Sequence, residues 1–273
     1  MGELYYTIGQ STYWYEVDGE GIPIVMLHGF TGSTKTWQHV KSAFGSGYQI
    51  IAIDLPGHGK TEATHVKTME MCCADLHALF QSLGFEKIHL VGYSMGGRTA
   101  LSFAMTYPSM IQSLILESAS PGIADEAERH LRVAADEKLA ERIERDGIQA
   151  FVDYWQDIPL FASQKNLPLR IQQAIRRERL TQTAEGLSQS LRAMGTGAQG
   201  SWWDRLESFE RPVQLLVGEL DPKFIATNKK MHAALKSSKM IVCEDAGHAI
   251  HVEKPEIFGK LIEEFIDSVT DKK

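Results

Sequence analysis

The fold is decided by residues 88–98, which read IHLVGYSMGGR. The apolar run at 88–91 predicts a buried strand, and the small residues after position 95 predict a helix. Between them, GYSMG at 92–96 fits the strand–turn–helix setting in which a nucleophilic serine is held on a sharp turn. The glycines permit such a turn because they carry no Cβ atom. We therefore predict that Ser94 presents its hydroxyl at the end of a strand.

Apolar runs elsewhere in the chain indicate what surrounds this turn. They predict further strands at 12–17, 24–27, 50–53, 114–116, 213–217 and 240–242. The first two flank a glycine-containing turn at 19–21, which predicts an opening hairpin. Segments of helical period, such as 71–83 and 97–107, separate most of the other strands. Short strands that alternate with helices predict a mainly parallel sheet with helices on both faces.

The alternation stops between residues 121 and 204. This part contains helix-like sequence rich in Arg and Glu, at 124–144, 147–155 and 169–194. We predict a core formed by residues 1–120 and 205–273 and a helical cap, residues 121–204, inserted after the sixth strand. A cap over the carboxyl ends of the strands would enclose the place where open α/β sheets bind ligands.

Two more residues at predicted strand ends complete a catalytic pattern. Asp221 follows the next-to-last strand, and His248 follows the last one. The chain order Ser94, Asp221, His248 is the order of the triad in the α/β-hydrolase fold, which is the fold class we predict. Asp221 would fix the tautomer of His248, and the imidazole would take the proton of Ser94. Glu219 is an alternative acid, but Pro222 after Asp221 favours the latter.

Backbone donors are expected beside Ser94. The N–H groups of Met95, after the serine, and of Phe30, in the loop after an early strand, would form an oxyanion hole. His28 in that loop is an alternative base, but the triad histidine comes last in this fold, so we expect His28 to orient the loop.

Two other patterns carry less information. GTGAQG at 195–200 fits Gly-x-Gly-x-x-Gly, but it ends a predicted helix instead of following a strand, which favours a flexible end of the cap over a nucleotide site. His248 and His251 are three residues apart without a further ligand at suitable spacing, so no metal site is predicted. For His251 we expect packing or a place in the pocket wall.

Composition restricts the class of ligand. The 273 residues are 43% hydrophobic and 23% charged, with a net charge of −7. Such a chain predicts a compact protein that binds neither nucleic acid nor anionic membrane surfaces through a general positive charge. The N-terminus lacks the features of a signal peptide, and no apolar run approaches the roughly 20 residues of a membrane span. We expect a cytoplasmic monomer or small homo-oligomer without membrane insertion.

Arginines supply local positive charge. Arg98 stands one helical turn after Ser94, where its guanidinium could hold a carboxylate beside the serine, or form a structural ion pair. Trp155 could line the pocket or pack in the core. The sequence leaves open which arginines of the cap face the pocket: Arg129, Arg132, Arg176, Arg177 and Arg179.

Four segments together resemble a known enzyme family. They are GYSMGGR at 92–98, LESASPG at 116–122, the cap segment from 128 to 140, and SLRAMGTGAQ at 190–199. They are similar to the 2-succinyl-6-hydroxy-2,4-cyclohexadiene-1-carboxylate synthases of menaquinone biosynthesis, and the resemblance spans nearly the whole chain.

This resemblance implies a lyase that eliminates pyruvate from an enolpyruvyl-bearing cyclohexene substrate without a cofactor. Ser94 would then act as a general base instead of an acyl-forming nucleophile. The family's substrate is a small polycarboxylate, and matching motifs imply that it is bound by Tyr93, Arg98, Arg132, Trp155 and Arg179; Arg176 is an alternative to Arg179. Two rival readings are a serine hydrolase of a small carboxylated ester or C–C bond, and a non-catalytic ligand receptor on the same fold.

Overall fold

The computed structural model describes residues 2–63 and 65–270. These residues form a nine-stranded sheet in the order β1-β2-β4-β3-β6-β7-β8-β9, with the short strand β5 beside β2. Neighbouring strands are parallel from β4 to β9, whereas the pairs formed by β2 are antiparallel. The predicted mainly parallel sheet is confirmed. The strands are β1 (Gly2–Ile8), β2 (Ser11–Gly19), β3 (Ile22–Leu27), β4 (Tyr48–Ile53), β5 (Glu62–Ala63), β6 (Ile88–Tyr93), β7 (Ile111–Glu117), β8 (Val213–Gly218) and β9 (Ser238–Cys243).

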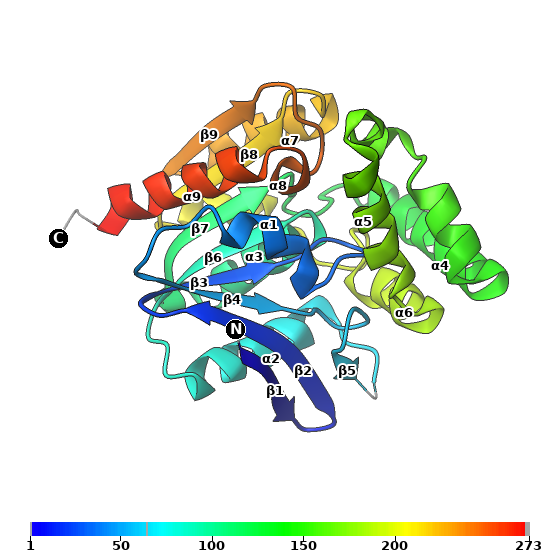
Figure 1. Cartoon of the computed structure of the whole chain (residues 1–273), viewed down its shortest axis with the longest axis horizontal. Helices are drawn as coiled ribbons and strands as arrows, with labels where there is room; N and C mark the ends of the chain where they lie inside the picture. Colours follow the sequence, from blue (N-terminus) through cyan, green and yellow to red (C-terminus); the bar gives the residue numbers. More distant parts are fainter. Residues whose placement is uncertain (1, 64, 271–273) are drawn as a thin grey trace.

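Helices cover both faces of this sheet (Figure 1). Residues of α2 and α3 share one apolar cluster with the strands, and residues of α1 and α9 share a second cluster with the opposite strand side chains. Alternate residues of a strand point to opposite faces, so each buried strand contributes to both clusters. The α-helices are α1 (Gln38–Lys41), α2 (Met69–Ser82), α3 (Met95–Thr106), α4 (Glu126–Trp155), α5 (Leu169–Leu180), α6 (Ala184–Met194), α7 (Pro222–Ala234), α8 (Ile250–Glu253) and α9 (Pro255–Thr270), and the 3-10 helices are η1 (Thr34–Trp37), η2 (Pro108–Met110), η3 (Pro159–Asn166) and η4 (Trp203–Ser208).

The predicted opening hairpin of β2 and β3 is wrong. Strand β2 forms its hairpin with β1, and β4 lies between β2 and β3. The turn at 19–21 crosses over the start of β4: a Cβ atom on Gly19 would lie 2.4 Å from the carbonyl oxygen of Tyr48. Gly19 also has φ = 75°, which favours glycine. The glycines are therefore needed because the chain after β2 passes close to the start of β4, and not because β2 and β3 form a hairpin.

The cap helices lie beyond the arrowheads of the strands, on the right in Figure 1. The segment follows β7, the seventh strand in chain order once the two-residue β5 is counted. The helices expected at 124–144 and 147–155 form α4, broken at Gly147 by φ = 79°, and the one expected at 169–194 is divided into α5 and α6. Cap residues that include Ile143, Phe151 and Leu187 form an apolar cluster. This cluster supports our proposal that residues 121–204 are a cap on the core.

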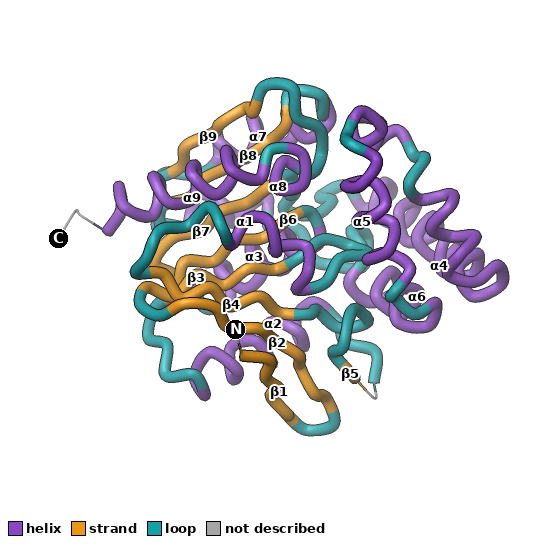
Figure 2. The backbone as a smooth tube through the Cα atoms, viewed as in Figure 1, coloured by secondary structure: helices purple, strands orange, loops and turns teal. Residues whose placement is uncertain are grey.

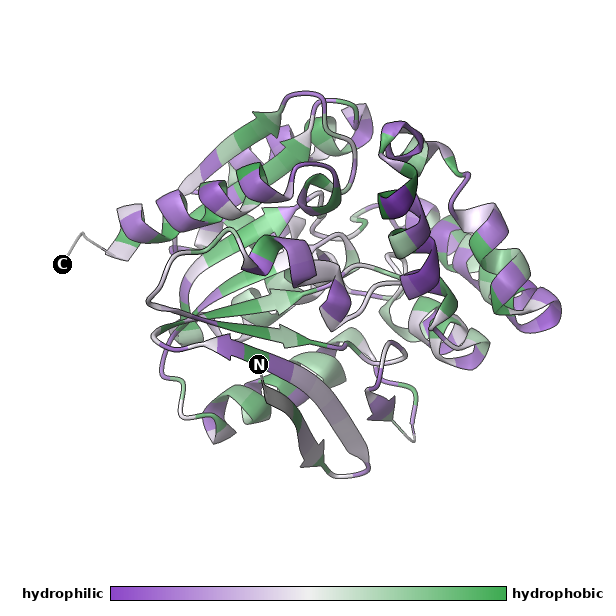
Figure 3. Ribbon diagram, in the orientation of Figure 1, coloured by the Kyte–Doolittle hydropathy of each residue, from purple (hydrophilic) through white to green (hydrophobic). Residues whose placement is uncertain are grey.

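Hydropathy follows the same division (Figure 3). The central strands are predominantly apolar, because both of their faces are buried under helices. The cap helices alternate polar and apolar side chains, since one side faces solvent. Within the described part of the chain, no helix has the length and apolarity to cross a membrane.

Candidate active site

The turn between β6 and α3 holds Ser94 in a strained conformation. Its φ of 50° and ψ of −107° lie outside the regions that most residues adopt. A Cβ atom on Gly96 would lie 2.1 Å from the carbonyl oxygen of Leu27, and one on Gly92 would lie 2.3 Å from that of Gly96. The glycines are therefore required because the start of α3 packs directly against the end of β3. The result places the Ser94 side chain at the carboxyl edge of the sheet.

Ser94 is joined to a histidine and an aspartate. His248 Nε2 lies 3.0 Å from Ser94 Oγ, and His248 Nδ1 lies 2.7 Å from Asp221 Oδ2. The imidazole is 1% exposed and the Asp221 side chain 5% exposed. If Nδ1 donates to the carboxylate, Nε2 is free to accept the serine proton, which is the arrangement of a Ser–His–Asp triad.

Asp221 is held independently of His248. Its Oδ1 accepts a hydrogen bond from the N–H of Phe224, at 3.3 Å, as the N-cap of α7. The alternative acid Glu219 points elsewhere, since its Oε2 accepts from the N–H of Asp245 at 3.1 Å. The geometry therefore favours Asp221 over Glu219 as the partner of the imidazole.

The expected oxyanion donors lie beside Ser94. Within 2–63 and 65–270, neither the Phe30 nor the Met95 backbone N–H donates to a protein acceptor. Met95 opens α3, and the first N–H groups of a helix have no partner within it. Both donors are therefore free for an oxygen atom beside Ser94.

His28 holds the Phe30 loop in place. Its Nε2 accepts from the Leu55 N–H at 3.0 Å, so Nδ1 carries the proton and donates to the Gly29 carbonyl at 2.8 Å. Burial lowers the pKa of His28 to about 4, which keeps the ring neutral. Its place is structural, as expected, and it lies outside the Ser94–His248 hydrogen bond.

A cavity of about 960 Å³ opens above Ser94 and is lined by both core and cap. Figure 2 shows the loops that follow the strands passing between the sheet and the cap helices. The lining of this cavity contains Ser94, His248 and both predicted oxyanion residues. It also contains most of the predicted binding residues, namely Tyr93, Arg98, Arg132 and Trp155. The structure therefore brings residues far apart in sequence into one compartment.

Arg98 is a buried cation in this cavity. It is 8% exposed, and its Nη1 donates to the Met194 carbonyl at 2.8 Å and to Gln199 Oε1 at 2.5 Å. No carboxylate in the described residues forms an ion pair with it, so the alternative of a structural ion pair is not observed. Burial lowers the pKa of Arg98 to about 10, and the side chain stays charged at neutral pH.

Gln199 belongs to the Gly-x-Gly-x-x-Gly segment, which the sequence suggested was a flexible end of the cap. That reading is wrong, because Gln199 is 1% exposed and bonded to Arg98. The segment lies after α6 and not between a strand and a helix. Within it, Gln199 is a buried support for the arginine.

Two of the predicted binding residues, Arg132 and Trp155, line this cavity from the cap, beside other charged and aromatic side chains such as Asp136 and Tyr154. Arg132 Nε donates to Asp136 Oδ1 at 2.8 Å, four residues along α4. Trp155 stacks on Phe151 and meets Phe30 and Phe161 edge to face. Its Nε1 is buried without a partner in the described structure. Both residues line the cavity that contains Ser94.

Arg179 lies elsewhere. It lines a second cavity of about 360 Å³, not the one that contains Ser94. Its guanidinium stacks over Phe161 at 4.5 Å and donates to Gln164 at 3.3 Å. Phe30, Tyr93 and Phe161 line both cavities. Arg179 thus lies in the adjoining cavity, and its contact with a ligand beside Ser94 stays a prediction.

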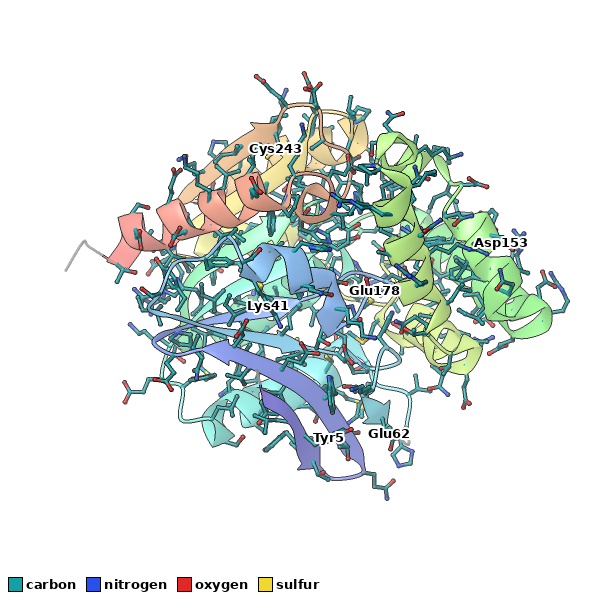
Figure 4. All side chains as sticks on the ribbon, viewed as in Figure 1. Tyr5, Lys41, Glu62, Asp153, Glu178 and Cys243 are labelled. Carbon is teal, nitrogen blue, oxygen red and sulfur yellow. The ribbon has the colours of Figure 1, made fainter. Side chains whose placement is uncertain are left out.

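The remaining cap arginines divide similarly. Arg177 lines the second cavity, whereas Arg176 pairs with Asp153 at 2.6 Å on the outer side of the cap, where Figure 4 labels Asp153. Arg129 is in the lining of neither cavity. Of the five arginines that the sequence left open, Arg132 is the one that shares the cavity with Ser94.

Two lysines of the wall were missed by sequence reasoning. Lys223 and Lys230 both line the Ser94 cavity from α7 and are exposed. They form no ion pair with a described acidic residue. Their spacing of seven residues on the helix that begins after Asp221 places them on one face, and that spacing is the signal that could have found them.

His251 pairs with a buried acid. Its Nδ1 lies 2.7 Å from Glu117 Oε2, and its ring packs against Tyr93 at 4.4 Å between centroids. This agrees with the packing expected for it. No cluster of three or more potential metal ligands exists among the residues that the structure describes.

Fold and site define the class of protein. A serine on a strand–helix turn, a histidine and an aspartate at later strand ends, and two free N–H groups beside the serine are the features of a triad enzyme on an α/β sheet. Residues 22–255 match the family described as alpha/beta hydrolase fold.

Closer relatives narrow this class. The chain is 31% identical to the 2-succinyl-6-hydroxy-2,4-cyclohexadiene-1-carboxylate synthase of Serratia proteamaculans (strain 568), over 89% of this chain and 92% of the relative. It is 43% identical to a Bacillus subtilis (strain 168) protein with a provisional form of the same name, over 98% of this chain and all of the relative. The solved structure of MenH from S. aureus superposes with a TM-score of 0.91 and 36% identity, over 94% of this chain and 98% of that one. The chain belongs to the 2-succinyl-6-hydroxy-2,4-cyclohexadiene-1-carboxylate synthase family of α/β hydrolases, which confirms the resemblance.

Proposed function

We propose that the protein eliminates pyruvate from 2-succinyl-5-enolpyruvyl-6-hydroxy-3-cyclohexene-1-carboxylate to give 2-succinyl-6-hydroxy-2,4-cyclohexadiene-1-carboxylate, a step of menaquinone biosynthesis. Family membership supports this reaction. The observation that carries it in the structure is that Ser94, bonded to His248, opens into the same cavity as the buried Arg98. A base and a carboxylate clamp side by side are what this proton abstraction needs.

In the proposed mechanism Ser94 is the base that removes a ring proton. His248 accepts the hydroxyl proton of Ser94, and the serine oxygen takes the proton from the carbon next to the succinyl ketone. The ketone oxygen becomes enolate-like and accepts hydrogen bonds from the N–H groups of Phe30 and Met95. The enolate then re-forms the ketone, its electron pair moves through the ring double bond, and the C–O bond to the enolpyruvyl group breaks with its pair on oxygen. The released pyruvate enolate takes one proton at carbon, equal to the one removed from the ring, and becomes pyruvate. No cofactor enters these steps.

Substrate charge is matched by the cavity wall. Arg98, from the core, and Arg132, from the cap, would each bind a carboxylate, and a guanidinium can do so through two parallel hydrogen bonds. Tyr93 and Trp155 would contact the cyclohexene ring of the substrate. Burial raises the pKa of Tyr93, so its phenol stays protonated and can donate. We further propose a cytoplasmic location, as expected from the sequence.

The test is a direct comparison of two substrates. The enolpyruvyl precursor is incubated with the enzyme, and pyruvate release is followed beside the hydrolysis of a small aryl ester. We expect rapid pyruvate release and slow ester turnover. Fast ester hydrolysis without pyruvate would instead establish the rival serine hydrolase, because the same triad supports both reactions.

A further inference from the structure

Glu253 joins the loop of the catalytic histidine to the cap. Its Oε2 accepts a hydrogen bond from the N–H of Gly247 at 2.8 Å, and Gly247 directly precedes His248. Its Oε1 accepts from the hydroxyl of Ser163 at 2.9 Å. Ser163 belongs to η3, between the cap helices α4 and α5. One carboxylate therefore bridges two elements that are 90 residues apart along the chain.

The cap element on the other side of this bridge contains parts of both cavity walls. Phe161 in η3 lies 6.2 Å from the His248 ring between centroids and lines the Ser94 cavity. Gln164, in the same element, accepts from Arg179. Any movement of η3 would thus reach the imidazole through Phe161 and through Glu253 at the same time.

The contact is close enough to constrain the chain. A Cβ atom on Gly247 would lie 2.0 Å from Ser163 Oγ and 3.0 Å from Glu253 Oε1. Burial raises the pKa of Glu253, while the hydrogen bonds from Gly247 and Ser163 act in the opposite direction. A carboxylate that accepts two hydrogen bonds in this way is a fixed acceptor for the backbone N–H next to the catalytic residue.

A similar bridge joins the cap to the core beside the loop that contains Phe30. Glu178 of α5 accepts from the hydroxyls of Ser33 and Thr36, each at 2.8 Å, and Figure 4 labels Glu178 at this boundary between cap and core. That bridge ends three residues after Phe30, whereas the Glu253 bridge ends on the residue adjacent to His248. Glu253 therefore has the more direct connection to the proton-transfer group.

We propose that Glu253 is a positioning residue for His248, which makes the placement of the imidazole depend on the docking of η3. The inference rests on the proposed function, because it assigns His248 to proton transfer. Loss of the carboxylate frees the Gly247 N–H and lets the imidazole move away from Ser94. Small displacements of a catalytic group cost up to about a hundredfold in rate.

The test uses variants that remove one side of the bridge or both. Glu253→Ala is expected to lower kcat by about tenfold or more with a small change in KM. Glu253→Gln is expected to restore most of kcat, because its amide oxygen accepts from Gly247 while its NH2 group donates to Ser163. Ser163→Ala releases only the cap and is expected to raise KM more than it lowers kcat. Glu256→Gln, an exposed acid at the start of α9, is the matched control and is expected to match the wild type.

A second readout needs no substrate. The proton between His248 Nδ1 and Asp221 Oδ2 should give a downfield NMR resonance, and Glu253→Ala should shift or broaden it, whereas Glu253→Gln and Glu256→Gln should preserve it. If wild-type enzyme releases no pyruvate, the proposed function fails, but this resonance still tests the positioning role.

Two results would overturn the inference. One is a Glu253→Ala variant with wild-type kcat and an unchanged resonance. The other is a Glu253→Gln variant as slow as the alanine variant, which would mean that the charge matters and not the geometry. Should Glu253→Ala not fold, Glu253→Asp decides: its shorter side chain cannot hold both partners, and wild-type kcat in that variant would refute the role.

Discussion

The two walls of the cavity above Ser94 are built differently. On the core side, strand ends fix the triad through hydrogen bonds of 2.7 and 3.0 Å, and Asp221 is also held by the backbone of α7. On the cap side, Arg132 donates to Asp136 Oδ1. In the described structure, the second carboxylate oxygen of Asp136 and the indole N–H of Trp155 are buried without a partner. Buried polar groups normally find a partner. The triad is thus paired before a ligand arrives, whereas other groups of the cavity wall are left for one. In the described structure these include the N–H groups of Phe30 and Met95, Ser118 Oγ and Trp155 Nε1.

The difference assigns chemistry to the triad and recognition to the charged side chains of the cavity wall, chiefly Arg98 from the core and Arg132 from the cap. A complete triad can abstract a proton from any substrate carbon that lies close to it. Which substrate binds is decided by the charged side chains of the wall that pair with its carboxylates. The next five predictions test this assignment, from the largest effect to the smallest.

Removal of the serine hydroxyl should have the largest effect. Ser94→Ala is expected to lower kcat by roughly 10⁴-fold or more, because the member of the triad that contacts the substrate is lost. KM should change little, since the charged groups of the wall remain. Pyruvate release under saturating substrate measures both. Activity within tenfold of the wild type would remove Ser94 from the proton transfer.

The core should also be sensitive to acid. Burial lowers the pKa of His28 to about 4, of His58 to about 3 and of His89 to about 4. The pKa of an unfolded histidine is about 6.5. Between that value and the folded pKa the unfolded chain binds more protons, so the protein loses stability as the pH is lowered. Each histidine costs about 1.4 kcal/mol per pH unit in this window. Asp54, whose pKa burial raises to about 6, offsets part of the loss, because the folded state retains its proton longer.

Urea unfolding at pH 7.5 and at pH 5 measures this effect. His89→Gln should reduce the slope of unfolding free energy against pH by about one proton, because one buried neutral imidazole is removed. His89 is a suitable site for this change, since its Nδ1 lies 2.7 Å from Ser113 Oγ, apart from the catalytic loops. An equal free energy of unfolding at both pH values would contradict the burial of neutral histidines.

Arg98 comes next. Arg98→Ala should lower kcat/KM by about a hundredfold, because a buried, charged partner of a substrate carboxylate is worth roughly 2–5 kcal/mol. Arg98→Lys should recover part of the lost kcat/KM, because lysine keeps the positive charge but lacks the planar guanidinium that donates two parallel hydrogen bonds. Thermal unfolding is the control, since Arg98 also supports Met194 and Gln199. Wild-type kinetics in a folded Arg98→Ala variant would exclude a carboxylate clamp.

A single cap arginine should matter less. Arg132→Ala is expected to raise KM by about tenfold with kcat nearly kept, because Arg132 is 39% exposed and its charge is partly screened by solvent. Arg129→Ala, on the same helix and outside the cavity lining, is the control. Equal effects of the two changes would mean that the cap acts through its overall charge and not through a directed contact.

The smallest effect is expected from the lysines at the mouth. Lys223→Gln together with Lys230→Gln should lower kcat/KM by about three- to tenfold at low salt and by less at high salt, because exposed charges act mainly by steering an anionic substrate. Lys229→Gln, an exposed neighbour outside the lining, is the control. A loss that is independent of ionic strength would indicate direct binding instead.

Local pattern and chain order were enough to predict several features of this protein. The glycines around Ser94 predict the turn that holds it. Asp221 and His248 can be predicted because each follows an apolar strand in the order that the fold requires. The cap could be recognised as a break in strand–helix alternation. These signals are local, and the sheet then brings the strand ends together.

Contacts between segments far apart in the chain could be seen only in the folded protein. It paired β2 with β1 instead of β3, placed Arg132 in the cavity and Arg179 behind Phe161, and buried Gln199 against Arg98. It also joined Glu253 to Ser163. A helical period shows which side of a helix is polar, but not which of several arginines on that side meets a cavity, because the packing angle of the cap on the core sets that choice.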